Sequence, residues 1–401
     1  MKKVEKGILE ILSFLKRNVK DLLTEEELKE KLIRKKVLRV KLGIDATGPD
    51  IHLGFAVVLR KLREFQDFGH IACLVVGDFT AKIGDPTGRS KVRPMLSDKE
   101  IKENMKRYEQ QIFKILDKDK TEFYYNSSWH SKLKIEEFIE IASKYTVARL
   151  LERDDFMKRY KNNLPIYLHE FLYPLFQAYD SIAINADIEL GGEDQYWNLL
   201  VGRELMREFN LEPQIVMTLP LLIGLDGKLK MSKSYNNYVS IEDDPKNMFG
   251  KIMSIPDELI IHYFRLCTNR REEEIKEFEE RLKQGENPRN LKAQLAKDIV
   301  SIYHSLEAAK KAEEEFERVF KYKELPEEIP VFYSSFKNIK LVDLLVNTQL
   351  LPSKSEARRK IREGGVYLNG ERILDIDYEV VIDKEIVIKV GKRKFLKVLP
   401  R

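Results

Sequence analysis

Between residue 37 and about residue 220, short apolar runs alternate with stretches of helical periodicity. The apolar runs predict strands at residues 37–44, 71–76, 123–125, 181–186 and 214–217. The amphipathic stretches predict helices at residues 52–68, 100–116, 135–155, 166–180 and 193–209. Such alternation is typical of a parallel sheet with crossover helices, so we predict an α/β, Rossmann-like domain. Its ligands are expected at the carboxyl ends of the strands.

The flanking regions have a different character. Residues 1–36 are predicted to be a helical segment, and residues 37–245 to be the Rossmann-like domain. Residues 246–325 have an almost wholly helical pattern, which predicts a second, helical domain. Residues 326–338 contain Pro326 and Pro330 and are predicted to be a linker. A small α+β module follows at residues 339–401.

The C-terminal module carries the signals of a basic helix followed by a hairpin. Ser353 and Glu356 have the spacing of a capping box, so a helix is predicted to begin at Lys354. Asn369 and Gly370 then predict a tight hairpin turn. Residues 340–401 hold 14 Lys/Arg and 9 Asp/Glu, a difference of +5, which equals the net charge of the whole chain. A basic module on a neutral body favours a nucleic-acid partner.

Composition narrows the class of protein. The charged fraction is 34% and no window approaches about 18 uninterrupted apolar residues, so no membrane span is predicted. The two cysteines, Cys73 and Cys267, are far apart in apolar contexts. They predict buried thiols in a reducing, cytoplasmic compartment, and they supply no cluster for a metal site.

A basic, hydroxyl-rich segment follows the apolar run 219–225. It reads Lys230, Met231, Ser232, Lys233 and Ser234. Two lysines at a spacing of three, on a loop with small residues, suit a triphosphate whose charge shifts during transfer. Taken alone, the same pattern also fits a solvated basic loop.

A second segment precedes the predicted helix 52–68. His52 lies at the start of this helix, where the helix dipole favours anions. Gly54 has no side chain, so a flat ring can lie against the backbone. A surface histidine beside a helix cap is the alternative interpretation of this segment alone.

Together the two segments resemble a known signature. His52-Leu53-Gly54-Phe55 with Lys230–Ser234 resembles the HIGH and KMSKS pair of the class I aminoacyl-tRNA synthetases. Nearly all of the chain is similar to the tyrosyl-tRNA synthetases of bacterial type. The resemblance implies activation of L-tyrosine by ATP, with Mg²⁺, and transfer of tyrosine to tRNA(Tyr). It also implies a homodimer, and an anticodon-side location for residues 246–325.

The resemblance assigns roles to individual residues. The implied catalytic residues are Thr47, His52, Lys230 and Lys233. The implied ATP contacts are Asp45, Gly54, Gly192, Asp194, Lys230 and Lys233. The C-terminal module resembles the alpha-L RNA-binding fold, which implies RNA contacts from Lys354, Arg358, Arg359, Lys360 and Arg362. For that module, a generic basic helix is the alternative.

A third motif carries the amino-acid specificity. Tyr173, Gln177 and Asp180 are spaced i, i+4 and i+7, so they lie on one helix face. By residue type alone this face is equally a buried polar cluster. In the family, the matching Tyr and Gln hold the substrate ammonium, and the Asp meets the phenolic hydroxyl. A phenylalanine in that place leaves the carboxylate unpaired.

Further substrate contacts and some departures follow from the same resemblance. Gln195 and Asp85 match the family's remaining tyrosine ligands. Three positions break the family pattern: Phe55 replaces the last His of HIGH, Leu42 replaces a ribose-contacting Cys, and Lys41 replaces a frequent Tyr. We expect Lys41 to be a neighbour of Asp180.

Two alternatives remain open on the sequence. A tryptophanyl-tRNA synthetase shares the fold and both signatures, and Asp180 with the Tyr/Gln pair favours tyrosine over tryptophan. A non-catalytic RNA-binding paralogue is the other alternative. The intact His52, Lys230 and Lys233 argue against it.

Overall fold

The computed structural model describes residues 2–45, 50–85, 97–320, 329–391 and 394–401. The chain divides into two compact units, Met1–Leu306 and Glu307–Arg401, and each is described by itself.

The first unit is built on a six-stranded sheet in the order β1-β6-β5-β2-β3-β4. Its strands are β1 Asp21–Leu23, β2 Arg39–Ile44, β3 Ile71–Val76, β4 Thr121–Tyr125, β5 Ile188–Gly192 and β6 Ile215–Leu219. The five strands from β2 to β6 pair in parallel. The predicted α/β class with a parallel sheet is therefore confirmed.

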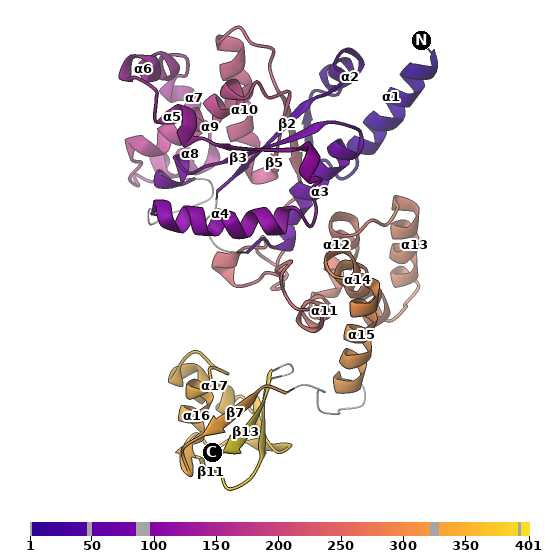
Figure 1. The fold of residues 1–401 in the computed structure, drawn as a ribbon, viewed down its shortest axis with the longest axis vertical. Coiled ribbons are helices and arrows are strands. Elements are labelled where there is room, and N and C mark those ends of the chain that lie inside the picture. The colour runs from indigo at the N-terminus through magenta and orange to yellow at the C-terminus, as the bar shows by residue number, and fades with distance from the viewer. Residues whose placement is uncertain (1, 46–49, 86–96, 321–328, 392–393) are drawn as a thin grey trace. The chain divides into compact units, whose positions relative to one another are not determined.

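Helices connect these strands (Figure 1). They are α3 Leu53–Asp67, α4 Asp98–Ile112, α5 Ser127–His130, α6 Ile135–Ser143, α7 Val147–Leu151, α8 Asp154–Lys161, α9 Leu168–Ala183 and α10 Tyr196–Glu208. Helix α3 packs on β3 and β5, and α10 packs on β5 and β6. Strands β3 and β6 are almost wholly buried, as expected of continuous apolar runs in a covered parallel sheet.

Two predicted elements are wrong. The strand predicted at residues 181–186 is the last turn of α9 and a turn, and β5 begins only at Ile188. Ser181 is fully buried, and its hydroxyl is bonded to Lys41, so tertiary contacts stabilise the helical turn. Asn185 then ends the helix with φ 51°. The single helix predicted at 135–155 is divided, because Thr146 caps the separate helix α7.

The N-terminal segment was predicted to be helical throughout, but it also contains a strand. Helices α1 Lys2–Leu15 and α2 Glu25–Arg34 flank strand β1, which pairs antiparallel with β6 through Asp21 and Thr218. The apolar pair Leu22 and Leu23 is too short to signal a strand by periodicity. These residues form a strand because the backbone groups along one edge of β6 pair with them.

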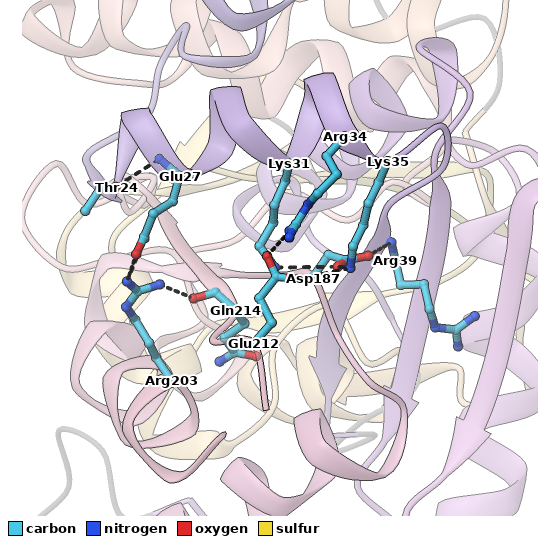
Figure 2. Close-up of polar contacts among 10 residues, drawn as sticks. All are labelled: Thr24, Glu27, Lys31, Arg34, Lys35, Arg39, Asp187, Arg203, Glu212 and Gln214. Atoms are coloured by element: carbon cyan, nitrogen blue, oxygen red, sulfur yellow. Dashed lines mark hydrogen bonds and ion pairs between the residues drawn. The ribbon is translucent and has the colours of Figure 1, made fainter. Parts of the chain in front are cut away.

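An ion-pair network holds α2 against the sheet's connecting loops (Figure 2). Lys31 is 2% exposed, and its Nζ lies 3.5 Å from Asp187 Oδ1 and 3.2 Å from Glu212 Oε1. Arg203 from α10 donates to both carboxylate oxygens of Glu27 at 2.6 Å. Burial is the largest single influence on Glu27 and opposes its ionisation. The hydrogen bond and charge of Arg203, together with the hydrogen bonds of Thr24, outweigh burial and lower the pKa of this carboxyl.

Glu27→Gln is expected to lower the free energy of unfolding by about 1–2 kcal/mol, since it removes a charge-assisted bond to a buried guanidinium. A carboxyl group whose pKa is lowered by folding stabilises the fold at pH values above its ordinary pKa of 4.5. This contribution to the free energy of unfolding is lost as the pH falls through the folded-state pKa. The variant's deficit should therefore be present at pH 7 and shrink below about pH 4.5. Denaturant unfolding at both pH values measures it. Glu26→Gln, in the same helical turn but exposed, is the matched control.

Four further helices complete the first unit: α11 Pro245–Met253, α12 Ile260–Cys267, α13 Glu272–Lys283 and α14 Pro288–Tyr303. Helix α14 packs on α11 and α12. Within the described ranges, no helix is long and apolar enough to cross a membrane.

The second unit contains helix α15 Leu306–Phe320 and a five-stranded sheet in the order β10-β9-β12-β13-β7. Its other elements are β7 Val331–Ser334, β8 Asn338–Lys340, α16 Leu341–Asn347, α17 Lys354–Arg362, β9 Val366–Leu368, β10 Glu371–Ile373, β11 Glu379–Val381, β12 Ile386–Val390 and β13 Lys394–Pro400. Helix α17 begins at Lys354 as predicted, and the Asn369-Gly370 turn joins β9 to β10 with both φ positive.

The segment predicted as a linker is partly structured. Strand β7 falls inside residues 326–338, and it pairs in parallel with β13, with Val331 beside Lys397. The two prolines suggested a linker, but β7 lies after Pro330 and occupies the sheet edge, where proline neighbours are tolerated. The C-terminal module therefore includes Val331–Ser334.

Candidate active site

A cleft of about 770 Å³ opens at the carboxyl ends of β2, β3 and β5. Strand β2 lies between β5 and β3, so the chain order reverses here, and this is where open α/β sheets bind ligands. Of the predicted catalytic, ATP and tyrosine residues, these line the cleft: Asp45, His52, Gly54, Asp85, Tyr173, Gln177, Asp180, Gly192, Asp194, Gln195 and Lys230. Thr47 lies outside the described residues, and Lys233 is not part of the lining.

His52 is the N-cap of α3. Its Nδ1 accepts a hydrogen bond from the backbone N–H of Phe55 at 3.2 Å. Burial, followed by the charges of Lys233 and Lys230, lowers the pKa of His52 to about 4. The imidazole is therefore neutral near pH 7, and because Nδ1 accepts, Nε2 carries the proton. His52 thus offers one N–H donor and no charge to a ligand in the cleft.

Gly54 allows the Lys230–Ser234 loop to approach the start of α3. A Cβ at Gly54 would lie 3.1 Å from His52 Nδ1 and 3.3 Å from Met231 Cβ. Met231 is buried, so it anchors the loop at this point. Any larger residue at position 54 would push the histidine or the loop away.

The two lysines of this loop have different partners. Lys230 Nζ lies 2.5 Å from Asp194 Oδ2, at the mouth of the cleft. Lys233 Nζ donates to the carbonyl of Asp50 at 2.9 Å and to the hydroxyl of Tyr108, on α4, at 2.8 Å.

The polar face of α9 points into the opposite part of the cleft. Tyr173, Gln177 and Asp180 all line it. The hydroxyl of Tyr173 donates to Asp45 Oδ2 at 3.2 Å. Burial raises the pKa of Tyr173 well above its ordinary value, so this phenol remains a donor. This hydrogen bond therefore connects α9 to Asp45 at the carboxyl end of β2.

Asp180 is held by three side chains that the sequence analysis missed. Trp129 Nε1 and His130 Nε2 lie 2.9 and 2.7 Å from Asp180 Oδ1, and Asn126 Nδ2 lies 3.2 Å from Oδ2. All three follow the end of β4, and that position at the carboxyl edge of a strand was the only signal for them. A carboxylate has about four acceptor sites, so one remains for a ligand's hydroxyl.

Lys41 is not the neighbour of Asp180 that we expected. Its Nζ lies 2.9 Å from Glu189 Oε1 and donates to Ser181 Oγ at 2.7 Å and to the carbonyl of Gln177 at 2.9 Å. Lys41 and Glu189 face each other in the β2–β5 ladder, at 0% and 1% exposure. The register of the sheet thus pairs Lys41 beneath Gln177, whose amide also donates to Glu189 at 3.2 Å.

The remaining predicted ligands form a chain of amides and carboxylates. Gln195 Nε2 donates to Asp85 Oδ2 at 2.9 Å, and Asn198 donates to Gln195 Oε1 at 3.0 Å. A Cβ at Gly192 would lie 2.7 Å from Asp194 Oδ1, so a larger residue would displace this carboxylate. The cleft is therefore lined by carboxylates and amides, by the His52 donor and by the Lys230 cation, which is paired with Asp194.

Sequence comparison identifies the family. The family model for class I tRNA synthetases (W and Y) matches residues 34–321, and the model for the tyrosine--tRNA ligase SYY-like C-terminal domain matches residues 321–398. The tyrosine--tRNA ligase of Thermotoga maritima is 56% identical over 391 residues, which are 97% of both chains. This chain belongs to the class I tyrosyl-tRNA synthetases. The tyrosine--tRNA ligase of Aquifex aeolicus, 50% identical over 97% of this chain and 98% of its own, agrees.

Solved structures of tyrosyl-tRNA synthetases share the fold. The enzyme of Archaeoglobus fulgidus, solved with L-tyrosine, is 25% identical with a TM-score of 0.62, over 76% of this chain and 99% of its own. A C-terminally truncated mitochondrial enzyme of Aspergillus nidulans gives 0.64 at 20% identity, over 80% and 100%, which supports the fold alone. Because the curated relatives are tyrosine--tRNA ligases, the tryptophanyl and non-catalytic alternatives are not favoured.

Proposed function

We propose that this cleft activates L-tyrosine with ATP and that the chain transfers the tyrosyl group to tRNA(Tyr). The observation that carries the proposal is Asp180, a nearly buried carboxylate held by three donors with one acceptor site left, on the face that also presents Tyr173 and Gln177. Pyrophosphate exchange dependent on tyrosine, tryptophan or phenylalanine tests it. Exchange with tyrosine alone is expected, and exchange driven by tryptophan would contradict the assignment.

The chemistry needs no covalent bond to the enzyme. A carboxylate oxygen of tyrosine attacks the α-phosphate of ATP and pyrophosphate leaves, giving tyrosyl-adenylate. A terminal ribose hydroxyl of the tRNA then attacks the tyrosyl carbonyl, and AMP leaves. Positioning and charge stabilisation supply the catalysis. We assign the phosphates to His52, Lys230 and Lys233, and the family resemblance adds Thr47.

The other assignments are proposals from the family resemblance, supported by the presence of these residues in the cleft lining. We assign ATP to Asp45, Gly54, Gly192 and Asp194, with Asp194 at the ribose hydroxyls. We assign the amino acid's ammonium to Tyr173, Gln177 and Asp85, and a further contact with the amino acid to Gln195. Asp194 is paired with Lys230 without ligands, so we propose that ribose hydroxyls replace Lys230 at Asp194 when ATP binds.

Magnesium is proposed as a companion of ATP. Mg²⁺ retains several waters and is bound mainly through substrate phosphates and one or two carboxylates. No group of three His, Cys, Asp or Glu with metal-holding geometry occurs among the described residues. This residue set fits an ion that the phosphates bring and hold largely by themselves. Bound there, Mg²⁺ would neutralise phosphate charge.

We further propose that the protein works as a homodimer. Helices α6 to α9 and their connections carry a group of exposed apolar side chains: Ile135, Ile139, Val147, Tyr160, Leu164, Tyr167 and Leu168. Leu168 and Ile135 are each 75% exposed. A contiguous exposed apolar patch marks an association surface. These residues lie on packed helices, since α7 packs on α8 and α6 packs on α9.

Ile139→Glu is expected to weaken this dimer by at least about 30-fold, because truncating a central apolar contact costs about 2 kcal/mol and the carboxylate would also be desolvated. Sedimentation of the purified protein over a concentration series measures the dissociation constant. Ile33→Glu is the matched control, since Ile33 on α2 is exposed to a similar degree, 56% against 59%. A variant that remains as dimeric as the control would place the interface elsewhere.

We assign tRNA contact to helix α17. Its buried face is Ala357 and Ile361, and Arg358 and Arg362 are exposed one turn apart. In the described part of the chain these two arginines form no ion pair. Arg359, Lys360 and Lys354 are paired with Glu356, Glu363 and Asp343. Arg358 and Arg362 are therefore the cations most available to phosphates.

Arg358→Gln with Arg362→Gln is expected to lower the log–log salt slope of tRNA binding by about 1.4–1.8, at 0.7–0.9 per phosphate contact. Tyrosyl-adenylate formation should not change. A chain ending at residue 328 should likewise make adenylate but charge tRNA poorly. The chain is not ended at Ser335, because β7 would then lack its partner strand β13. Lys384→Gln, an exposed lysine of the same module, is the control. An unchanged slope in the double variant removes α17 from the RNA contact.

The compartment is proposed to be the cytoplasm. Cys73 and Cys267 are free and buried, and burial raises the pKa of each thiol to about 12. Unpaired, unreactive thiols are usual in a reducing compartment.

A further inference from the structure

One row of side chains across the C-terminal sheet alternates between cations and aromatic rings. Arg372 of β10 is opposite Tyr367 of β9, Tyr367 is opposite Lys389 of β12, and Lys389 is opposite Phe395 of β13. Lys389 Nζ lies 5.7 Å from the Tyr367 ring centroid and 5.4 Å from that of Phe395. Two rings thus flank one ammonium. The Arg372 guanidinium, at the end of the row, donates to the carbonyls of Gly364 at 2.9 Å and Glu363 at 3.2 Å, where α17 ends.

Three residues of this row, Tyr367, Lys389 and Phe395, lie on the sheet face opposite to the helices. The alternate residues Leu368, Ile388 and Leu396 are buried in one core cluster with Ala357 and Ile361 of α17. Successive side chains of a strand point to opposite faces, so Tyr367, Lys389 and Phe395 point away from α17. All three are partly exposed. Tyr333 lies on β7, at the edge of the same sheet, and is 63% exposed. Its neighbour Phe332 packs against the core, so Tyr333 points to the other face.

The simplest explanation of the row is a cation–π cluster that only stabilises the module. That explanation assigns no binding role to the rings and cations of this face. Tyr367 and Phe395 are two strands apart, about 9–10 Å at the usual spacing. Exposed rings at such spacing, interleaved with cations, are the means by which proteins stack unpaired bases and hold their phosphates. Bases inside an RNA duplex are stacked on each other and do not reach such rings.

The charge of the face selects nucleic acid over protein as the occupant. The row's ionised groups, Arg372 and Lys389, are both basic, and residues 340–401 carry 14 Lys/Arg against 9 Asp/Glu. Lys397, one row further along β13, is basic too and is paired with Glu385 at 3.1 Å.

We propose that this face, defined by Tyr367, Lys389 and Phe395, binds unpaired nucleotides of the tRNA. Bases stack on the two rings, and Lys389 contacts a phosphate. Helix α17, on the other side of the core, contacts helical backbone. The proposal rests on the proposed tRNA function, because it names which part of the RNA reaches which face of the module.

The test uses the full chain and two RNA probes, a single-stranded oligoribonucleotide of mixed sequence and a blunt duplex of the same length. Tyr367→Leu with Phe395→Leu keeps apolar bulk but removes both flat rings. Binding of the single strand is expected to fall at least fivefold per ring, from the lower limit of about 1 kcal/mol per stacked base, with duplex binding unchanged. Lys389→Gln should lower the single-strand salt slope by about 0.7.

Matched controls separate this face from the rest of the module. Tyr378→Leu with Phe336→Leu makes the same two changes at exposed rings outside the row, and single-strand affinity should not change. Arg358→Gln with Arg362→Gln should weaken the duplex more than the single strand. Melting temperatures near that of the parent chain confirm that each variant is folded.

Several results would overturn the proposal: unchanged single-strand binding in the two-ring variant, an equal loss for the duplex, or no binding of the single strand by the parent chain. Binding of an acidic peptide that competes at the same face, without RNA binding, would assign it to a protein partner instead. Tyrosine-dependent pyrophosphate exchange is measured in parallel. Loss of exchange in the parent chain would contradict the proposed function, whereas intact exchange with failed RNA stacking contradicts only this inference.

Discussion

Lys230→Ala is expected to slow tyrosyl-adenylate formation by about 10²–10³-fold, the usual cost of removing one preorganised group that stabilises transition-state charge. Lys230 lies at the mouth of the cleft beside Asp194, where a leaving pyrophosphate would gather charge. Because this contact strengthens mainly in the transition state, tyrosine affinity should be unchanged. Pre-steady-state adenylate formation and equilibrium tyrosine binding measure the two quantities.

Lys228→Ala is the control for this prediction, since Lys228 is an exposed lysine two residues away that does not line the cleft. Lys233→Ala should also slow the reaction, although Lys233 now contacts Asp50 and Tyr108. Tyr108→Phe removes one of these contacts and keeps the cation, so it should leave the rate near normal. If Tyr108→Phe were as slow as Lys233→Ala, then Lys233 would serve the loop's structure and not the phosphates.

Asp180→Asn should reduce the preference for tyrosine over phenylalanine by at least about 100-fold. Tyrosyl-tRNA synthetases are themselves the standard case of such discrimination, about 10⁵-fold, and we adopt that magnitude rather than calculate it. The physical reason is the remaining acceptor site of a carboxylate that Asn126, Trp129 and His130 already hold. Specificity constants for the two amino acids in pyrophosphate exchange give the ratio, and a ratio that survives the substitution would move hydroxyl recognition to another residue.

His130 provides a companion measurement. His130→Gln keeps a donor for Asp180 and should retain most of the discrimination, whereas His130→Leu removes the donor and should lose part of it. A purely structural role for His130 would lower stability in both variants without changing the ratio.

Local pattern was sufficient for much of the fold. Residues 71–76 and the start of α17 at Lys354 were placed correctly, because an uninterrupted apolar run and a Ser353 cap act through neighbours in the sequence. The turn at Asn369-Gly370 is of the same kind. Strands β1 and β7 were missed, since each is short and depends on a partner strand almost 200 or 66 residues away, Thr218 and Lys397. Pairing at that distance leaves no local signal.

The same division holds for the site. The candidate groups could be read from the chain alone: a histidine at a helix start, the Lys230 and Lys233 pair, and the Tyr173, Gln177 and Asp180 face, which periodicity places on one side of a helix. The neighbours of these groups could not, because they depend on the packing of the strands. Sheet register sets Lys41 against Glu189 instead of Asp180, and the end of β4 brings His130 to Asp180. These contacts join separate strands, so burial and pairing across the sheet created them, not spacing along the chain.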